Sequence, residues 1–418
     1  MDNIKKNSQW IYISVVVISL LMGFNTVLSF LVTLFLVGIY LVIPLKENIF
    51  LLFFLIPFDE VFVVPGIGSI FRFLQVILIF KILHYVFKKK ITITVKPFDI
   101  TFLIFLIMYV GLSFIFFSDF NVIGMLINAF IFIISREILS SDFDESIQKI
   151  FSIFSGAVCV AILWGILHGN FISGEGGIVR FSGTHEPNFF ALFVNMGILF
   201  LLNSSFLKKT KTPLLLILYA GLFLTLSMSG MMLNVIMISL YLILNKKINF
   251  SKKLFLYPLA IIALLAFILI LRTQLTVLDE LLIRLEERIL LVISGNMNAA
   301  TTGRTELQEF YLKKYFSLNV FQQFFGIFTI REINILNYFG LTLDVYTLNF
   351  PHNTFIEMIF SFGYIGTVFF LIYSFRNLMI HRKSNHFTTL FILRVIIFIS
   401  ATNLSLLNTR HFYSWLIL

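Results

Sequence analysis

The sequence predicts an all-α integral membrane protein with about 13 transmembrane helices. Three observations predict this class. Of the 418 residues, 59% are hydrophobic and only 12% are charged, which is far outside the usage of globular proteins. Apolar runs long enough to cross a bilayer recur along the chain, separated by short polar interruptions. Phenylalanine alone supplies 53 residues, as suits a tightly packed and lipid-facing bundle.

The spans follow from cutting the chain at its charged or turn-forming interruptions. The first one, behind a short basic start, continues beyond the core of a signal peptide, so we expect it to be retained. Asn25 separates it from the second, Pro57 weakens the third, and Lys88 to Lys90 follow the fourth. The expected spans cover residues 10–24, 26–44, 49–63, 70–87, 98–117, 122–134, 147–168, 188–202, 213–227, 231–244, 254–271, 353–374 and 387–407.

One long stretch between the last spans must sit outside the hydrocarbon of the membrane. It carries acidic and basic side chains from Asp279 to Asp344, and each charge would cost about 2.5–3.5 kcal/mol at the bilayer centre. We therefore expect a large extracytoplasmic helical loop, 273–352, inserted in a single polytopic membrane domain, 1–418. Helical spacing of apolar residues predicts an amphipathic helix over 275–293, ended by Ser294-Gly295-Asn296, and a second helix starting at Thr305.

The basic residues indicate the orientation of the chain. With a cytoplasmic N-terminus, about twenty of the 31 Lys and Arg residues fall in or beside one set of loops, as the positive-inside rule requires. The opposite short loops hold only Arg72, Arg180 and Arg410. Topology therefore explains the net charge of +10 without nucleic acid as a partner. It also places the long loop outside the cytoplasm.

Two features that could suggest other chemistry have structural interpretations. The single cysteine, Cys159, excludes an internal disulfide or a cysteine-based metal site, and it lies in an apolar run as a small packed hydrophobe. Asp142-Phe143-Asp144 superficially resembles the paired aspartates that hold a metal in nucleotide-sugar transferases. By topology this pair is cytoplasmic, and we expect it to cap a helix beginning near Ser146.

Three places on the expected outer face could carry chemistry. They are Arg180-Phe-Ser-Gly183 with His185-Glu186-Pro187-Asn188, then Thr302-Gly303-Arg304, and then Pro351-His352-Asn353 followed by Gly363-Tyr-Ile-Gly366. Arginine suits a diphosphate because its planar guanidinium donates paired hydrogen bonds and keeps its charge. Histidine can take a proton from a hydroxyl near neutral pH. The alternative is that each arginine only contacts headgroup phosphates.

These motifs resemble a known family. Arg180-x-x-Gly183 with Asn188, Gly303-Arg304, and His352-Asn353 nine residues before Gly363-x-x-Gly366 are similar in order and spacing to motifs of the bacterial O-antigen ligase and polymerase superfamily. The resemblance covers roughly the last 240 residues. The sequence departs from it at Ser227-Met228-Ser229-Gly230, where many relatives carry Ser-Arg and this segment has no arginine.

The resemblance implies a GT-C-like membrane glycosyltransferase of the bacterial inner membrane, with its active site on the periplasmic face. Its donor would be a glycan on undecaprenyl diphosphate, and no metal or other cofactor would be needed. Arg180 and Arg304 would bind the diphosphate and stabilise its departure, while His352 would act as the base. Asn188, Asn353, His185 and Glu186 would be further substrate-binding residues. Beyond the donor and the lipid bilayer, a chain-length regulator is a candidate partner.

Several alternatives stay open at this point. His185 or Glu186 could supply the base instead of His352, although Pro187 and its neighbours could also serve only as a turn. The leading hypothesis is a repeat-unit polymerase of O-antigen or capsule, and the runner-up is an O-antigen ligase with lipid A core as acceptor. A transporter or flippase of lipid-linked sugars is a third possibility, but such proteins usually carry repeated halves and ionisable residues near the midplane.

Overall fold

Over the described residues the fold is helical with two short antiparallel strand pairs, of which the first joins β1 (Val63–Val64) to β2 (Gly68–Ser69). The computed structural model describes residues 12, 14–64, 68–89, 91, 93–118, 122–173, 179–205, 210–245, 283, 286, 290–291, 293–295, 304–329, 334–335, 338–339, 353–404, 406–407 and 412–414. Contacts divide the chain into two compact units. The first unit comprises Met1–Lys96, Phe130–Asn234 and Ser384–Thr389, and the second comprises Pro97–Ala129, Val235–Lys383 and Leu390–Leu418.

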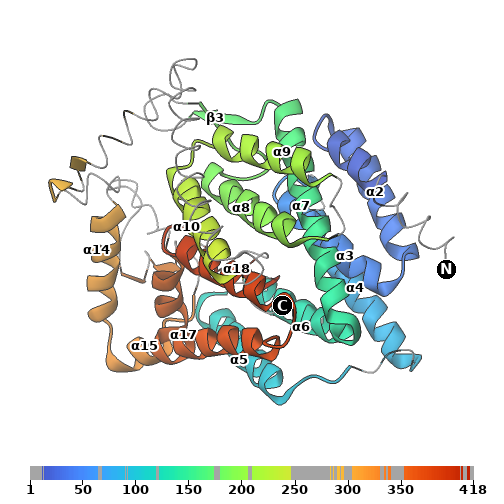
Figure 1. Cartoon of the computed structure of the whole chain (residues 1–418). Coiled ribbons are helices and arrows are strands. Elements are labelled where there is room, and N and C mark those ends of the chain that lie inside the picture. Colours follow the sequence, from blue (N-terminus) through green and yellow to red (C-terminus); the bar gives the residue numbers. More distant parts are fainter. Residues whose placement is uncertain are drawn as a thin grey trace. The chain divides into compact units, whose positions relative to one another are not determined.

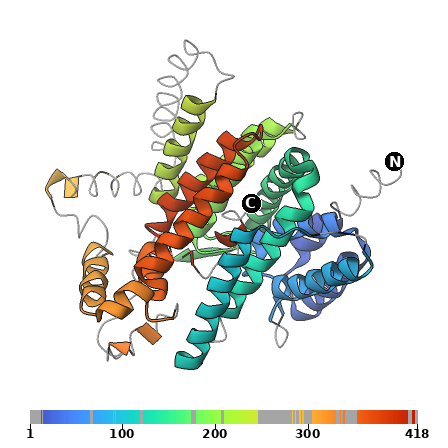
Figure 2. The same cartoon turned by 90° about the horizontal axis from the view of Figure 1, so that it is seen from below.

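Most of the expected spans are seen as helices. The first unit holds α2 (Thr26–Val42), α3 (Leu45–Leu55), the 3-10 turn η1 (Ile56–Phe58), α4 (Ile70–Phe87), η3 (Ser140–Asp142), α7 (Phe143–Leu167), α8 (Pro187–Asn203) and α9 (Lys211–Leu224), with parts of α6 (Ile123–Leu139) and α10 (Met228–Leu244). The second unit holds α5 (Pro97–Phe117), α14 (Arg304–Phe316), α15 (Val320–Phe325), α17 (Thr354–Ile380) and α18 (Phe387–Ala401) from Leu390 onward. Figures 1 and 2 show these elements in two views.

The lengths of these helices fit a membrane protein. Among the described residues, the stretches Ile70–Phe87, Pro97–Phe117, Ile123–Leu167 and Thr354–Ile380 are long and apolar enough to cross a bilayer, and five other apolar helices are shorter. The all-α membrane class is thus supported by the helices, while the count of 13 spans stays a prediction. The expected span 254–271 lies outside the described residues.

The core of the first unit forms around α7. This helix packs against α3, α8 and α9, and Phe151 of α7 stacks on Phe200 of α8 with ring centroids 4.3 Å apart. Glycine permits the closest approach, because a Cβ added at Gly221 of α9 would lie 2.4 Å from the Ile162 side chain. The packing explains why residues on all sides of α7 and α8 are apolar and buried.

The loops of the first unit separate into two sets at the two ends of α7. At its N-terminal end, which we call the ion-pair end, Lys46 pairs with Asp142 at 2.8 Å, Lys149 pairs with Glu47 at 2.5 Å, and Ser384 donates to Asp144 at 2.5 Å. At its C-terminal end, which we call the hairpin end, the Trp164 indole donates to the Met22 carbonyl at 2.8 Å. The hairpin β3 (Phe171–Ser173) and β4 (Val179–Phe181) follows there.

This separation matches the alternation of loops expected from the sequence. The loops predicted to be cytoplasmic lie at the ion-pair end of the first unit, and the loops predicted to be external lie at the hairpin end. Which membrane side each end faces stays a prediction. The expected capping is confirmed in position, because Asp142 is the N-cap residue of α7 and Asp144 lies in its first turn. The helix begins at Phe143 and no capping bond comes from the Asp142 side chain. The two carboxylates bind Lys46, Ser384 and Asn385.

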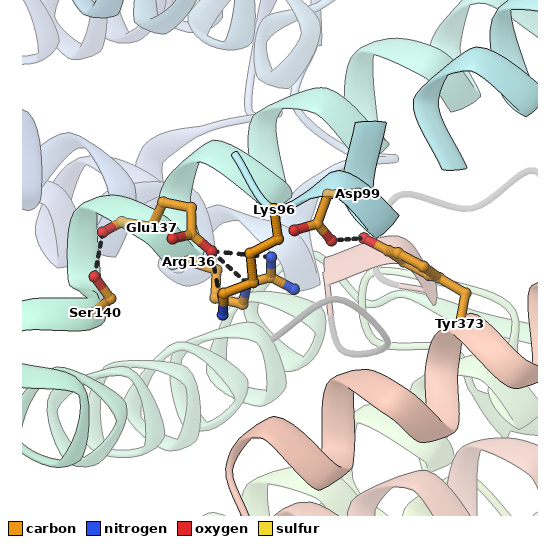
Figure 3. Close-up of polar contacts among 6 residues, drawn as sticks. All are labelled: Lys96, Asp99, Arg136, Glu137, Ser140 and Tyr373. Atoms are coloured by element: carbon orange, nitrogen blue, oxygen red, sulfur yellow. Dashed lines mark hydrogen bonds and ion pairs between the residues drawn. The ribbon is translucent and has the colours of Figure 1, made fainter. Parts of the chain in front are cut away.

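A buried arginine marks the end of α6 within the first unit (Figure 3). The Arg136 side chain is buried and pairs with Glu137 at 3.0 Å, and Lys96 lies 3.8 Å from the same carboxylate oxygen. The Ser140 hydroxyl donates to the Glu137 carbonyl at 2.7 Å. A charge at the end of a membrane helix is tolerated when it is paired in this way. We assign this cluster a structural role in ending α6.

In the second unit, α5 packs on α17 through aromatic rings. The rings of Phe102 and Tyr373 stack with centroids 3.8 Å apart. The Tyr373 hydroxyl donates to Asp99 at 2.8 Å, as Figure 3 shows for this pair. Asp99 lies in the first turn of α5, where a carboxylate is favoured by the helix dipole.

Helix α17 breaks at Gly363, the first glycine of the Gly-x-x-Gly motif. Gly363 has φ 65° and ψ −172° inside an otherwise continuous helix, a conformation that is essentially restricted to glycine. The break frees the carbonyls of Phe360 and Ser361. These accept from the backbone amides of Ile327 at 2.7 Å and Phe328 at 3.3 Å, in the turn after α15. Figure 1 shows α15 beside α17.

The long loop is partly helical, as the sequence predicts. The helix expected from Thr305 is confirmed as α14, whereas α15 was not predicted. Most of 275–293 lies outside the described residues, but Leu290, Leu291 and Ile293 are helical and a turn with Gly295 at φ 78° follows them. A glycine with positive φ commonly ends a helix, as predicted here.

Candidate functional site

The first candidate residue, Arg180, lies on the hairpin at the hairpin end of the first unit. It pairs with Ile172 across the β3–β4 ladder. The turn after β4 explains the Arg-x-x-Gly spacing, because Gly183 has φ 55° and a Cβ there would lie 2.5 Å from the Phe190 ring. The same turn fits against α7, where Gly165 closely approaches Gly183. The glycine of the Arg-x-x-Gly motif is therefore required for packing, because it lets the turn after β4 lie against α7 and α8.

Hydrogen bonds to two neighbouring segments hold the guanidinium of Arg180. Its Nε donates to the Thr225 carbonyl at 3.2 Å, and one Nη donates to the Asn188 side-chain oxygen at 3.0 Å. Both partners lie at helix ends, Thr225 at the end of α9 and Asn188 at the start of α8. The two hydrogen bonds therefore fix the direction of the guanidinium.

The start of α10 completes this cluster. The Ser227 hydroxyl donates to the same Asn188 oxygen at 2.8 Å, and it accepts from the Gly230 amide at 3.1 Å as a helix N-cap. A Cβ at Gly230 would lie 2.5 Å from the Ala191 side chain, so glycine lets α10 approach α8. We call Arg180, Asn188, Thr225, Ser227 and Ser229 the arginine cluster. The segment that departs from the family pattern is thus in contact with Asn188, a direct partner of Arg180.

Electrostatics favour an anion near this cluster. The first turns of α8 and α10 both contribute to it, and helix N-termini carry a partial positive charge. Glu186 offsets part of this charge, because its carboxylate accepts from the Asn188 amide at 3.1 Å and the Asn188 side chain at 2.6 Å. Glu186 therefore acts as the N-cap of α8. Its predicted substrate contact stays a prediction.

His185 has a separate, buried environment. Its side chain is 0% exposed, and its Nε2 lies 2.8 Å from Asp59, in the loop after η1. The Thr184 hydroxyl lies 3.1 Å from His185 Nδ1 and donates to the Pro57 carbonyl. The Phe193 ring packs edge-on against the imidazole at 4.8 Å. These contacts join the η1 loop to the start of α8 and give His185 an anchoring role.

Removing the Asp59 carboxylate should destabilise the protein. In Asp59→Ala the buried imidazole of His185 loses this partner, and such a loss costs about 1–3 kcal/mol. The matched control is Glu60→Ala, because the neighbouring carboxylate is 61% exposed and 3.9 Å from His185. The midpoint of thermal unfolding, measured on purified protein in detergent, should fall in the first variant only. Equal midpoints in both variants would contradict the anchoring role.

The remaining candidates belong to the second unit or lie outside the described residues. Arg304 is the first residue of α14, His352 lies outside the described residues, and Asn353 is the N-cap of α17. The Asn353 side chain accepts from the amides of Phe355 at 3.0 Å and Ile356 at 3.2 Å. The structure thus brings Arg180, Asn188 and Glu186 together. A common site for Arg180, Arg304 and His352 stays a prediction.

The start of α17 is also fixed from the C-terminal side. The Thr354 hydroxyl donates to the Leu404 carbonyl at 2.6 Å and accepts from the Leu406 amide at 2.8 Å. The residue after His352-Asn353 is therefore anchored to the segment that follows α18. Sequence reasoning missed Thr354, Thr225 and Asp59, because their partners are distant in the chain. Of these three residues, only Thr354 could have been suspected from the sequence, because it directly follows the His-Asn pair.

The helices and this cluster define an integral membrane protein with a polar site at helix ends. Residues 213–371 match a family model described as O-antigen ligase. The match covers part of the chain and agrees with the resemblance of the later sequence motifs to the O-antigen ligase and polymerase superfamily. It includes Arg304, His352 and Gly363, whereas Arg180 precedes it. A search of the curated proteins with the chain finds no match.

Proposed function

We propose that this protein is a repeat-unit polymerase of surface polysaccharide, O-antigen or capsule. It transfers the growing glycan from undecaprenyl diphosphate to the next lipid-linked unit, at the periplasmic face of the bacterial inner membrane, with its N-terminus in the cytoplasm. The observation that carries the proposal is the O-antigen ligase match over residues 213–371. The expected donor is an anionic, lipid-linked diphosphate, so the site needs fixed cations and exclusion of water.

The proposed reaction is an inverting displacement. The acceptor hydroxyl oxygen attacks the anomeric carbon while the bond from that carbon to the diphosphate oxygen breaks. His352 takes the hydroxyl proton, and the diphosphate leaves with its charge stabilised by Arg180 and Arg304. Two nearby guanidinium groups would favour the neutral, proton-accepting imidazole by like-charge repulsion. Asn188 holds the Arg180 guanidinium, and Asn353 is a further substrate-binding residue in this proposal.

The choice of His352 over His185 as base rests on burial. The His185 side chain is 0% exposed and its Nε2 faces Asp59 at 2.8 Å, so an acceptor hydroxyl has no approach to it in this conformation. Glu186 is engaged in capping α8. Both residues remain close in sequence to the arginine cluster, and in the proposal they shape the site without exchanging protons with the substrate.

An O-antigen ligase is the second candidate, favoured by the description of the matched family model. The two functions share the donor and differ in the acceptor. Incubation of the purified protein with one lipid-linked repeat unit, followed by product sizing, should give a ladder for a polymerase. Product that forms only after lipid A core is added identifies a ligase. No sugar transfer, with movement of the donor across the bilayer, would overturn both and indicate a flippase.

The choice between polymerase and ligase can also be tested in cells. Lipopolysaccharide from a deletion strain should carry a single capped repeat if the protein is the polymerase, and bare core if it is the ligase. A chain-length regulator is a proposed partner of the polymerase, since product length is not determined by a transfer site alone.

A further inference from the structure

Part of the long loop has the chemical character of a membrane segment. No charged residue occurs between Lys314 and Arg331. Within this stretch α15 exposes large apolar side chains, with Val320 70% and Phe321 62% exposed, and Phe324 and Phe325 are exposed as well. Exposed aromatic side chains grouped on one short helix mark an interaction surface. These side chains lie next to α17, so the surroundings of α17 indicate whether they contact water, protein or lipid.

Several backbone groups around the turn after α15 are paired within the protein. After α15 the chain leaves the helical conformation at Gly326, with φ 82°, which would leave polar groups unpaired in lipid. The carbonyls freed by the break at Gly363 accept from Ile327 and Phe328, and the Gly326 amide donates to the Gln322 carbonyl at 2.7 Å. The Ser361 hydroxyl also donates to the Thr329 carbonyl at 2.9 Å. The carbonyls freed by the break in α17 and the amides of the turn after α15 therefore pair with each other.

The polar side chains of the segment also have partners within the loop. Asn319 accepts from the Gln322 amide at 2.9 Å as the N-cap of α15. The Gln323 side chain donates to the Leu318 carbonyl at 2.8 Å and to the Phe316 carbonyl at 3.1 Å. The Tyr315 hydroxyl donates to the Gln323 carbonyl, and burial raises the pKa of Tyr315 to about 12, so it stays protonated. These bonds pair the polar side chains of Asn319, Gln323 and Tyr315 without water.

The exposed face of α15 is continuous with that of α17. The Phe324 ring lies 6.2 Å from the Tyr364 ring, just after the break. Farther along α17 the residues Ile365, Val368 and Ile372 are also exposed. This helix is long and apolar enough to cross the membrane, so its exposed apolar side chains meet lipid. Because the two apolar surfaces are continuous, we expect lipid to contact α15 as well.

We propose that residues 319–329 form a re-entrant element of the membrane, in which the Val320 and Phe321 side chains contact the acyl chains of the bilayer. The sequence expectation that all of 273–352 stays outside the hydrocarbon is modified by this proposal for these residues. It does not depend on the proposed glycosyltransferase function. The element would hold the broken part of α17 at the membrane boundary, in the helix that begins directly after Asn353.

The test uses spin labels in the full chain in lipid nanodiscs. Cysteine is introduced as Phe321→Cys in a Cys159→Ala background, which removes the single native thiol. The matched control is Glu309→Cys on α14, whose carboxylate is exposed and pairs with Lys313. Collision of the label with oxygen, which concentrates in lipid, and with a water-soluble nickel chelate is measured at both positions. The oxygen-to-nickel ratio should be at least severalfold higher at position 321 than at 309.

Equal ratios at the two positions would place α15 in water and overturn the proposal. Low collision with both reagents at 321 would mean that protein, such as a second copy, covers the surface, and would also overturn it. Val320→Cys repeats the measurement if the first variant does not fold. Undecaprenyl diphosphate is then added. An unchanged oxygen collision rate supports contact with bulk lipid, whereas a fall to the control value would assign the surface to the polyprenyl chain instead.

Discussion

Replacing Arg180 by alanine should lower the rate of glycan transfer from a lipid-linked donor about 10²–10³-fold, a loss of about 3–4 kcal/mol. The guanidinium is held by Thr225 at the end of α9 and by Asn188 in the first turn of α8, and alanine removes this fixed charge. The rate is measured with purified protein and one lipid-linked repeat unit. Because the proposed role is in the departure of the diphosphate, the loss should appear in kcat.

Two variants separate charge from geometry in this prediction. Arg180→Lys keeps the charge but loses the paired donors, so it should recover only part of the rate. Arg72→Ala removes an exposed arginine near the start of α4 and should transfer at the wild-type rate. His352→Ala and Arg304→Ala should abolish polymer growth while the protein stays inserted. Wild-type activity in Arg180→Ala would remove the basis of the proposed site.

Replacing Gly363 by alanine should destabilise the second unit by about 3–5 kcal/mol. The residue has φ 65°, and a Cβ there would lie 2.4 Å from the backbone carbon and oxygen of Phe324. Relief of this overlap requires α15 to move away from α17, which breaks the amide contacts of Ile327 and Phe328. The expected result is a lower midpoint of thermal unfolding and faster proteolysis near residues 319–329.

The matched control is Gly111→Ala in α5. No atom lies within 4 Å of a Cβ at Gly111, and its φ is not positive, so this variant should be as stable as the wild type or slightly more so. A Gly363→Ala protein with the wild-type midpoint would show that the break in α17 is not required for packing.

The positions of the helices could be predicted from the sequence because the apolar runs end at charges and turn residues. The helix at Pro97–Phe117, for example, differs from the expected 98–117 by one residue. The separation of loops into two ends also follows, since each span reverses the chain. Longer-range pairings could not be predicted. Asp59 and His185 are 126 residues apart, and no local pattern in the sequence joins them.

The candidate site was predictable only where its residues are close together in the sequence. Arg180 and Asn188 were found from a motif, and their contact at 3.0 Å follows from the short turn between β4 and α8. The role of Gly363 was not predictable from its spacing. Two glycines in an apolar run are compatible with a continuous helix, and the break depends on amides in another segment, Ile327 and Phe328.

The attachment of the chain's end to its first half has a consequence for biosynthesis. Residues Ser384–Thr389 belong to the first unit, and Ser384 binds Asp144, 240 residues earlier. A ribosome that adds about 5–20 residues per second needs about 12–48 s to make that stretch. The amino-terminal helices must therefore be held in the bilayer during synthesis before this unit can close. A nascent chain that stops before Ser384 leaves the first unit incomplete.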